Sequence, residues 1–271
     1  MIYTRHQPAA ALRRHVDHVW CLTDGPTHPA ERILPAGTVE VVVNLRDAAV
    51  CVENREGQQR LSGSVVSGPY TSPFDIDARK HTDMIGIHFK IGGALALLGV
   101  SPAELAETHV DLGALWGLEA DDLREQLCDA TSTAYRFRIV ESLLLGHLRD
   151  DDSVPNHVAR AVRTFARGGS QPPVRVLADE AGLSHRRFIA LFKVQVGMTP
   201  KKFARLCRFR SAHRTLISCR TPELSRIAVE HGYSDQSHMI REFQTFSGLT
   251  PTEHLDRCAQ ATKDDHVALR P

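Results

Sequence analysis

The feature that most constrains this chain is an internal repeat in its last third. Residues 176–200 resemble residues 226–251, with an offset of 50 positions before a short turn and 51 after it. The repeated positions include Ala178 and Ala228, Gly182 and Gly232, Ser184 and Ser234, Phe192 and Phe243, Gly197 and Gly248, and Pro200 and Pro251. A turn is where one inserted residue is tolerated best. The repeat therefore predicts one supersecondary unit that is used twice.

Each repeated position has a mechanical role. The small side chain of alanine lets another helix cross close by, and glycine allows the positive φ that follows a helix end. Ser184 and Ser234 are expected to cap the second helix of each unit. Phe192 and Phe243 each follow an apolar residue by four positions, which places both on an inward helix face. A helix, a glycine turn and a capped helix make a helix-turn-helix, and the sequence predicts two.

Charge divides the chain in the same way. Residues 1–152 hold 14 basic and 22 acidic side chains, whereas residues 153–258 hold 17 and 8, a net charge of +9. Nine basic residues and no acidic one lie between His185 and Arg214. Such a surface attracts a polyanion, although many helical domains carry a solvated basic face. Combined with two helix-turn-helix patterns, the charge predicts DNA binding.

A helical wheel with Phe192 and Phe243 inward indicates which side chains face DNA. The expected base readers are Arg186, Ala190, Gln236, Ser237, His238 and Arg241, with Arg241, Arg186 and Gln236 as the principal ones. Arginine pairs with guanine, glutamine pairs with adenine, and alanine can contact a thymine methyl. The expected phosphate contacts are Arg187, Lys193, Lys201 and Lys202. The alternative for any one of them is a solvated surface residue.

A long helix over residues 200–218 is expected to join the two units fairly rigidly. Two recognition helices held ~34 Å apart would enter successive major grooves on one face of the duplex. A monomer would then read an asymmetric site.

Residues 1–90 follow a strand-like pattern, with turn-forming residues between short apolar runs. The expected strands are Val16–Leu22, Thr38–Leu45, Ala48–Glu53, Ser64–Ser67 and Met84–Lys90. Many short strands at this spacing predict a small β-barrel or sandwich of the cupin-like kind. Helices are then expected from Ser101, where Ser-Pro-Ala-Glu forms a capping box, and over Glu119–Ala130, Thr133–Arg149 and Pro155–Arg167.

The expected fold class is therefore α+β, in two domains. Residues 1–150 would form a sensor domain, residues 153–258 an all-α domain with both helix-turn-helix units, and residues 259–271 a flexible tail. The acidic run Asp150–Ser153 marks the seam. The apolar face of Thr133–Arg149 fits either a dimer interface or an internal core.

These residues resemble the AraC family of bacterial transcription regulators. The most specific stretch is Gly232–Phe243, followed by Gly248-Leu249-Thr250-Pro251; Leu177–Ser184 and Phe188–Pro200 resemble the family's first unit. The resemblance covers residues 153–258 and implies sequence-specific binding of double-stranded DNA, with RNA polymerase as a further partner. Ala190 departs from the longer polar reader expected there. Leu34–Gly37 and His88–Ala94 are similar to sensor-like domains that precede some AraC-type units.

The first domain leaves alternatives open. One is effector sensing, in which an unidentified small molecule shifts the equilibrium between two arrangements. Another is a metal site that draws on His15, His18, His81 and His88 with Cys21 or Cys51, although scattered histidines explain the pattern more simply. No catalytic motif is present, so neither an enzyme nor a cofactor is expected. A third is architectural DNA binding without sequence preference.

The remaining sequence signals bear on location. Six cysteines are scattered without a C-x-x-C pair, which is typical of a reducing cytoplasm. Met1–Ala10 has no secretory pattern, and no apolar run is long enough to cross a membrane. A cytoplasmic protein without a membrane partner is expected.

Overall fold

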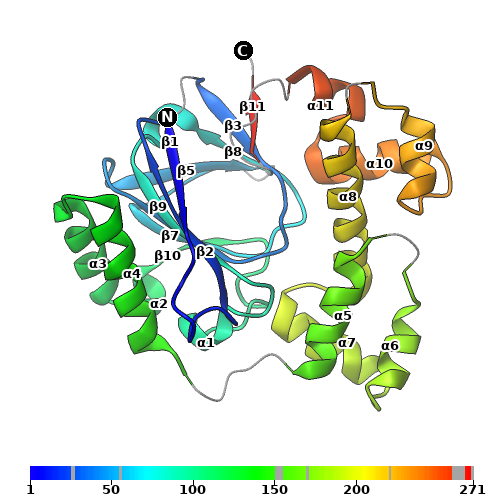
Figure 1. The fold of residues 1–271 in the computed structure, drawn as a ribbon, viewed down its shortest axis with the longest axis horizontal. Coiled ribbons are helices and arrows are strands. Elements are labelled where there is room, and N and C mark those ends of the chain that lie inside the picture. Colours follow the sequence, from blue (N-terminus) through cyan, green and yellow to red (C-terminus); the bar gives the residue numbers. More distant parts are fainter. Residues whose placement is uncertain are drawn as a thin grey trace.

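The computed structural model describes residues 1–25, 28–54, 57–149, 155–168, 171–219, 221–257 and 266–269. A β-rich half and a helical half lie side by side (Figure 1). The α+β class expected from the sequence is confirmed, with most strands before most helices and strand β11 (His266–Leu269) after them. Among the described helices, none combines the length and the apolar character needed to cross a bilayer.

The described strands form two antiparallel sheets. The first has the order β1-β2-β9-β4-β7-β10, and its strands are Ile2–His6, Val16–Thr23, Met84–Phe89, Glu40–Asn44, Ser64–Ser67 and His109–Asp111. The second has the order β11-β3-β8-β5-β6, and its strands are His266–Leu269, Ala30–Ile33, Phe74–Asp77, Ala49–Asn54 and Gly57–Ser62. The five strands expected from the sequence therefore exist as β2, β4, β5, β7 and β9.

Strand β4 illustrates why the first sheet has two apolar faces. Val41 and Val43 are buried in the core beneath the helices, whereas Val42 lines a cavity between the two sheets. Successive strand residues point to opposite faces, so this run of valines serves both layers. The core therefore lies on one side of the first sheet and the cavity on the other.

The β-rich half also contains helices. They are η1 (Ala78–Lys80), α1 (Leu95–Leu98), α2 (Gly113–Trp116), α3 (Glu119–Asp129) and α4 (Thr133–His147). Val140 and Leu144 of α4 are buried in the core, and Leu143 packs against it. The apolar face of α4 is thus occupied by its own domain, which favours the core interpretation over a dimer interface.

The expected helix at Ser101 does not form. The capping-box hydrogen bonds are present, because Ser101 Oγ accepts from the Ala103 N–H and a Glu104 carboxylate oxygen accepts from the Ser101 N–H, at 3.1 and 3.3 Å. The chain instead turns at Glu107, which has a positive φ of 60°, and continues into β10. The capping box therefore stabilises a turn here and not a helix.

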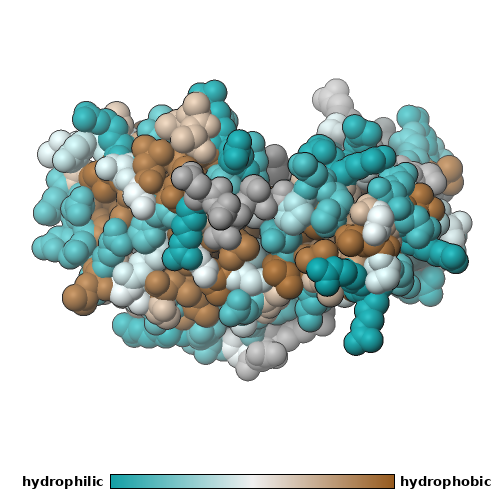
Figure 2. Space-filling view, turned by 90° about the horizontal axis from the view of Figure 1, so that it is seen from below, coloured by the Kyte–Doolittle hydropathy of each residue, from teal (hydrophilic) through white to brown (hydrophobic). Residues whose placement is uncertain are grey.

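The helical half contains α5 (Asn156–Ala166), α6 (Val174–Glu180), α7 (His185–Val196), α8 (Pro200–Ser218), α9 (Leu224–Glu230), α10 (Gln236–Ser247) and α11 (Pro251–Arg257). One apolar cluster holds these helices together around Phe192, Phe203, Phe209 and Phe243, all of them fully buried or nearly so. Hydrophilic side chains cover much of the outer part of this half in Figure 2. The seam expected at Asp150–Ser153 lies outside the described residues.

The two halves are in direct contact. Ser101 Oγ donates to the Val194 carbonyl at 2.7 Å, and Arg210 Nη1 donates to the Ala36 carbonyl at 2.9 Å. Leu34, which follows β3, is buried within the apolar cluster of the helical half. The β-rich half therefore contributes a side chain to the core of the helical half.

The expectation of a flexible tail over residues 259–271 is wrong for four of them. His266–Leu269 form β11, which pairs antiparallel with β3 at the edge of the second sheet (Figure 1). The reason is that β3 would otherwise leave its backbone N–H and C=O groups unpaired on that edge.

Candidate nucleic-acid interface

The two turns form as the repeat predicts. Gly182 and Gly232 have φ of 66° and 72°, and each lies between the two helices of its unit. Ala178 and Ala228 are fully buried where helices cross. The structure therefore contains two helix-turn-helix units, α6–α7 and α9–α10, which α8 joins.

The caps differ between the units. Ser184 Oγ accepts a hydrogen bond from the Arg187 N–H at 3.3 Å, as expected. The expected cap at Ser234 is wrong, because Asp235 Oδ1 accepts from the His238 N–H at 2.7 Å and so caps α10. The inserted residue of the second copy precedes the cap, so Ser184 corresponds to Asp235. Asp235 also places a carboxylate at the positive end of the α10 dipole, and the hydrogen bond from the His238 N–H lowers its pKa.

The structure places most of the expected DNA-facing side chains on the surface. Those that are exposed are Arg186, Arg187, Ala190, Lys193, Lys201, Lys202, Gln236, Ser237 and Arg241. His238 differs, since its ring packs edge-on against Tyr233 at 5.3 Å and its Nδ1 lies 3.1 Å from Ser234 Oγ. His238 is therefore half-buried and packs against the turn of the second unit.

A groove between α8 and α10 brings three of these residues together. Lys201, His238 and Arg241 line it, along with Arg205 and Arg208 of α8. The expected residues of the first unit do not line this groove. The structure thus brings the second unit and the start of α8 into one basic surface.

Glu242, the carboxylate that pairs with the arginines of this surface, was not identified from the sequence. Glu242 is 2% exposed, and its carboxylate lies 2.6 Å from Arg205 Nε and 3.2 Å from Arg208 Nη2. Glu242 occupies an inward wheel position between Met239 and Phe246, a place where an acidic residue needs a buried partner. That position was the signal in the sequence that could have identified it.

Lys202 is engaged by the other half of the molecule. Its Nζ lies 3.1 Å from Glu107 Oε1. Glu107 also accepts a hydrogen bond from the Thr71 hydroxyl, so the carboxylate is held in place. Lys202 therefore faces the β-rich half, whereas Lys201 faces the groove.

The metal alternative draws on histidines that the structure separates. His18 stacks on His88 with ring centroids 5.2 Å apart, whereas His81 lines the cavity between the sheets. Among the described residues, no group of three or more His, Cys, Asp or Glu side chains could hold a metal ion.

Comparisons with known proteins match the β-rich half and the helical half to separate families. Residues 177–257 match a family model described as a helix-turn-helix domain, and residues 4–111 match one described as a domain of unknown function (DUF6597). An uncharacterized HTH-type transcriptional regulator of Haemophilus influenzae is 31% identical over 81 residues, 30% of this chain and 27% of that protein. The probable transcriptional regulator LumQ of Photobacterium leiognathi is 36% identical over 81 residues, 30% of this chain and 32% of its own.

Solved structures also match this chain, at low similarity. A probable AraC family transcriptional regulator from Rhodopseudomonas palustris is 26% identical and covers 38% of this chain and 96% of its own, with a TM-score of 0.34. Unsaturated fatty acid bound ToxT from Vibrio cholerae is 10% identical and covers 88% and 93%, with a TM-score of 0.47. This chain spans about three tenths of the length of the two relatives matched by sequence. Residues 177–257 are thus similar to helix-turn-helix domains, and the sequence matches lie in this part of the chain.

Proposed function

We propose that this chain is a sequence-specific DNA-binding transcription regulator that responds to a small molecule through its β-rich half. The observation that carries the proposal is the pair of helix-turn-helix units with exposed second helices, α7 and α10, in a segment of net charge +9. A polyanion with two regularly spaced grooves is the partner that such a surface fits. RNA polymerase stays an expected partner of such a regulator.

The length of α8 supports a two-groove mode of binding. Its 19 residues extend ~28 Å at 1.5 Å per residue. That length is comparable to the ~34 Å between successive major grooves on one face of B-DNA. A rigid connector of this size lets one molecule present α7 and α10 to two neighbouring grooves.

The roles of individual side chains follow from their position and chemistry. Arg186 in α7 and Arg241 in α10 are exposed and can pair with guanine, and Gln236 at the start of α10 can pair with adenine. Ala190 and Ser237 add shorter contacts on the same helices. His238 is the weakest of the proposed readers, since its ring already packs on Tyr233.

Phosphate contacts are assigned to the exposed cations beside these readers. Arg187 and Lys193 of α7 and Lys201 of α8 are exposed, and a cation on a flexible stem neutralises phosphate without reading sequence. Lys202 joins them only in an arrangement in which Glu107 releases it. The ion pair between the halves thus supports a link between the sensor half and DNA affinity.

The test is a selection of bound sequences from a random duplex pool with the full chain, followed by competition with random duplex. A regulator of this kind yields a defined motif with two half-sites about one helical turn apart and keeps its target under competition. If the selection enriches no motif, and random competitor duplex displaces the bound DNA in proportion to its concentration, the architectural alternative is supported instead.

A further inference from the structure

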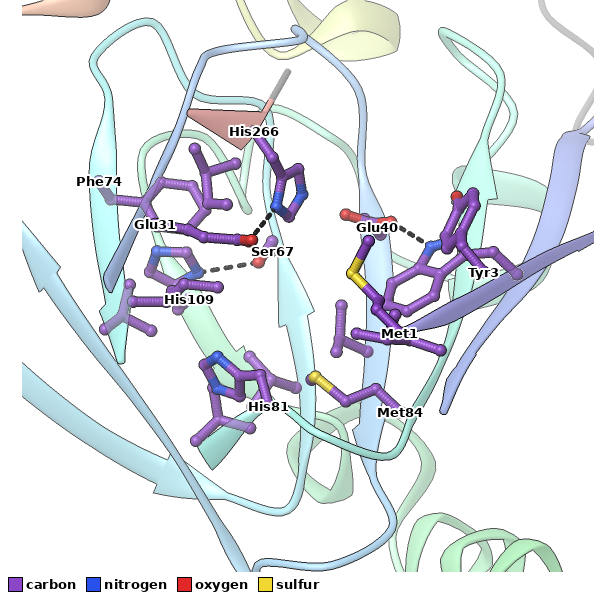
Figure 3. A pocket seen from close by; sticks show the side chains of 18 residues that line it. Met1, Tyr3, Glu31, Glu40, Ser67, Phe74, His81, Met84, His109 and His266 are labelled. Atoms are coloured by element: carbon purple, nitrogen blue, oxygen red, sulfur yellow. Dashed lines mark hydrogen bonds and ion pairs between the residues drawn. The ribbon is translucent and has the colours of Figure 1, made fainter. Parts of the chain in front are cut away.

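The cavity between the two sheets has a mainly apolar wall with polar groups on two sides. Aromatic side chains of Trp20, Tyr3 and Phe74 line it with aliphatic ones, and Figure 3 shows His81, His109 and His266 among them. The cavity volume is about 80 Å³, against the ~10–15 Å³ that one water molecule needs. A space of this size and character suits part of a small organic molecule.

Two of these histidines have ring nitrogens without a protein partner in the described residues. His81 is 3% exposed and neither of its ring nitrogens makes a hydrogen bond, and His109 is 4% exposed with Nε2 unpaired. The Nδ1 of His109 lies 2.9 Å from Ser67 Oγ, which fixes the ring. Burial lowers the pKa of each to about 4. Both imidazoles are therefore uncharged at neutral pH and can each donate or accept a hydrogen bond.

The charge of the wall limits what can bind. Glu31 and Glu40 line the cavity, and no lysine or arginine does so among the described residues. Glu31 Oε1 and Oε2 lie 2.7 and 2.6 Å from His28 Nε2 and His266 Nδ1, and Glu40 accepts a hydrogen bond from Trp20 Nε1 at 2.6 Å. An anion would meet two carboxylates here without a lysine or arginine side chain to pair with. Each carboxylate already has a protein partner, so an additional cation is not needed. These groups favour an uncharged guest.

One wall of this cavity comes from beyond the DNA-binding domain. His266 of β11 lines the cavity, whereas Val267, the next residue, is 1% exposed within the apolar cluster of the helical half. Its neighbour β3 alternates in the same way: Glu31 lines the cavity, and Arg32 Nη1 donates to the Ser247 carbonyl at the end of α10, at 3.4 Å. Because strand residues point alternately to opposite faces, β3 and β11 separate the cavity from the helical half by one strand layer.

We propose that the cavity is a composite binding site for an uncharged aromatic molecule with a hydroxyl group, completed by His266, and that β11 couples its occupancy to the helical half. His81 and His109 hold the hydroxyl group, and the aromatic walls hold the ring. The coupling part rests on the proposed function, whereas the binding part does not. A guest that contacts His266 fixes β11 and, with it, the position of Val267 in the helical core.

The probe is 1-naphthol, titrated calorimetrically into the full chain at pH 7.5. Three matched probes share its ring: 1-methylnaphthalene, 1-naphthoate and 1-naphthylmethylammonium. We expect 1-naphthol to bind about tenfold more tightly than each of them. Equal or tighter binding of 1-methylnaphthalene, the anion or the cation would overturn the assigned ligand class, as would binding of none of the four.

Variants locate the site. His81→Leu and His109→Leu should weaken 1-naphthol about tenfold and leave 1-methylnaphthalene unchanged, whereas His147→Leu, outside the cavity, should change neither. His266→Ala should weaken 1-naphthol, and the matched control is His28→Ala, which removes the other imidazole beside Glu31 without touching the cavity. Unchanged 1-naphthol affinity in His266→Ala would overturn the composite site.

Coupling is read from affinity for the selected DNA motif. Saturating 1-naphthol should change that affinity about fivefold or more in the full chain, and not in a chain shortened to residues 1–265. A change that persists in the shortened chain, or no change in the full one, would overturn the role of β11. Binding to DNA without 1-naphthol tests the proposed function separately, so a failure there is not confused with a failure here.

Discussion

Glu242 of α10 lies 2.6 Å from Arg205 of α8. The carboxylate is buried at 2% exposure and also lies 3.2 Å from Arg208. The recognition helix of the second unit is thus fixed to the connecting helix by an ion pair whose members line the same groove as Arg241. The orientation of the proposed base readers depends on this pair, because α10 has no other buried charge.

Replacing Glu242 with alanine should destabilise the helical half by about 1–3 kcal/mol, since it removes charge-assisted hydrogen bonds but leaves arginines that can turn toward water. Urea unfolding monitored by circular dichroism measures the change. Glu230→Ala is the matched control, because Glu230 pairs with Arg226 on an exposed helix face and should change little. If the two substitutions lower the free energy of unfolding equally, the buried ion pair contributes no more to stability than the exposed one.

The local features of the fold could be predicted because they depend on neighbouring residues. Gly182 and Gly232 adopt positive φ where the repeat requires a turn, and Pro200 begins α8. The strands with clear alternation were also found. Strand β6, Gly57–Ser62, was missed because its polar sequence lies mostly exposed and carries little apolar pattern.

Contacts between distant parts of the chain could not be predicted. Glu31 and His266 are 235 positions apart, and the sequence around each residue contains no pattern that predicts contact with the other. The same holds for Leu34, whose burial in the helical core depends on how the halves pack. The wheel correctly placed the other proposed readers on the surface, but it placed His238 too far outward because it could not include Tyr233 from the preceding turn.

Arg241→Ala should cost about 1–3 kcal/mol on the selected DNA motif and relax the preference at one base pair. The reason is that Arg241 is exposed at the groove and can pair bidentately with guanine. Binding to a panel of single-base variants of the motif measures both effects. Gln244→Ala, a change of an exposed residue on the same helix, serves as the control. An unchanged preference profile would remove Arg241 from the readers.

Lys201→Ala should weaken binding to all sequences alike and reduce the slope of log K against log salt by ~0.9, as expected for one lost phosphate contact. Lys202→Ala should have a smaller effect, since its ammonium group is paired with Glu107. Salt titrations of both variants, on motif and random duplex, make the comparison. A loss confined to the motif would assign Lys201 to base reading, and equal slopes would argue against the pairing of Lys202.

Acid should destabilise the β-rich half through His81 and His109. Burial lowers the pKa of each to about 4 in the folded chain, whereas the unfolded value is ~6.5. Between these values the unfolded chain binds more protons than the folded chain, so the free energy of unfolding falls as pH falls from ~6.5 to ~4. The loss at pH 5 is about 2 kcal/mol per histidine.

Urea unfolding at pH 7.5 and pH 5 measures this dependence. His81→Leu should flatten it, because leucine takes up no proton. A pH dependence that is the same in His81→Leu as in the unsubstituted chain would contradict the assignment to His81.

A fragment of residues 153–271 should fold and bind DNA without the first half. Apart from Leu34, the buried members of its apolar cluster come from its own residues, including Val158, Phe203 and Phe246. Loss of the Leu34 contact should lower its stability by about 1.5–3 kcal/mol, the value of one buried leucine. Leu34→Ala in the full chain is the matched comparison, since it removes the same contact and keeps both halves. Denaturation and a gel-shift titration test both statements, and a fragment that stays unfolded would show that the helical half needs the β-rich half to form its core.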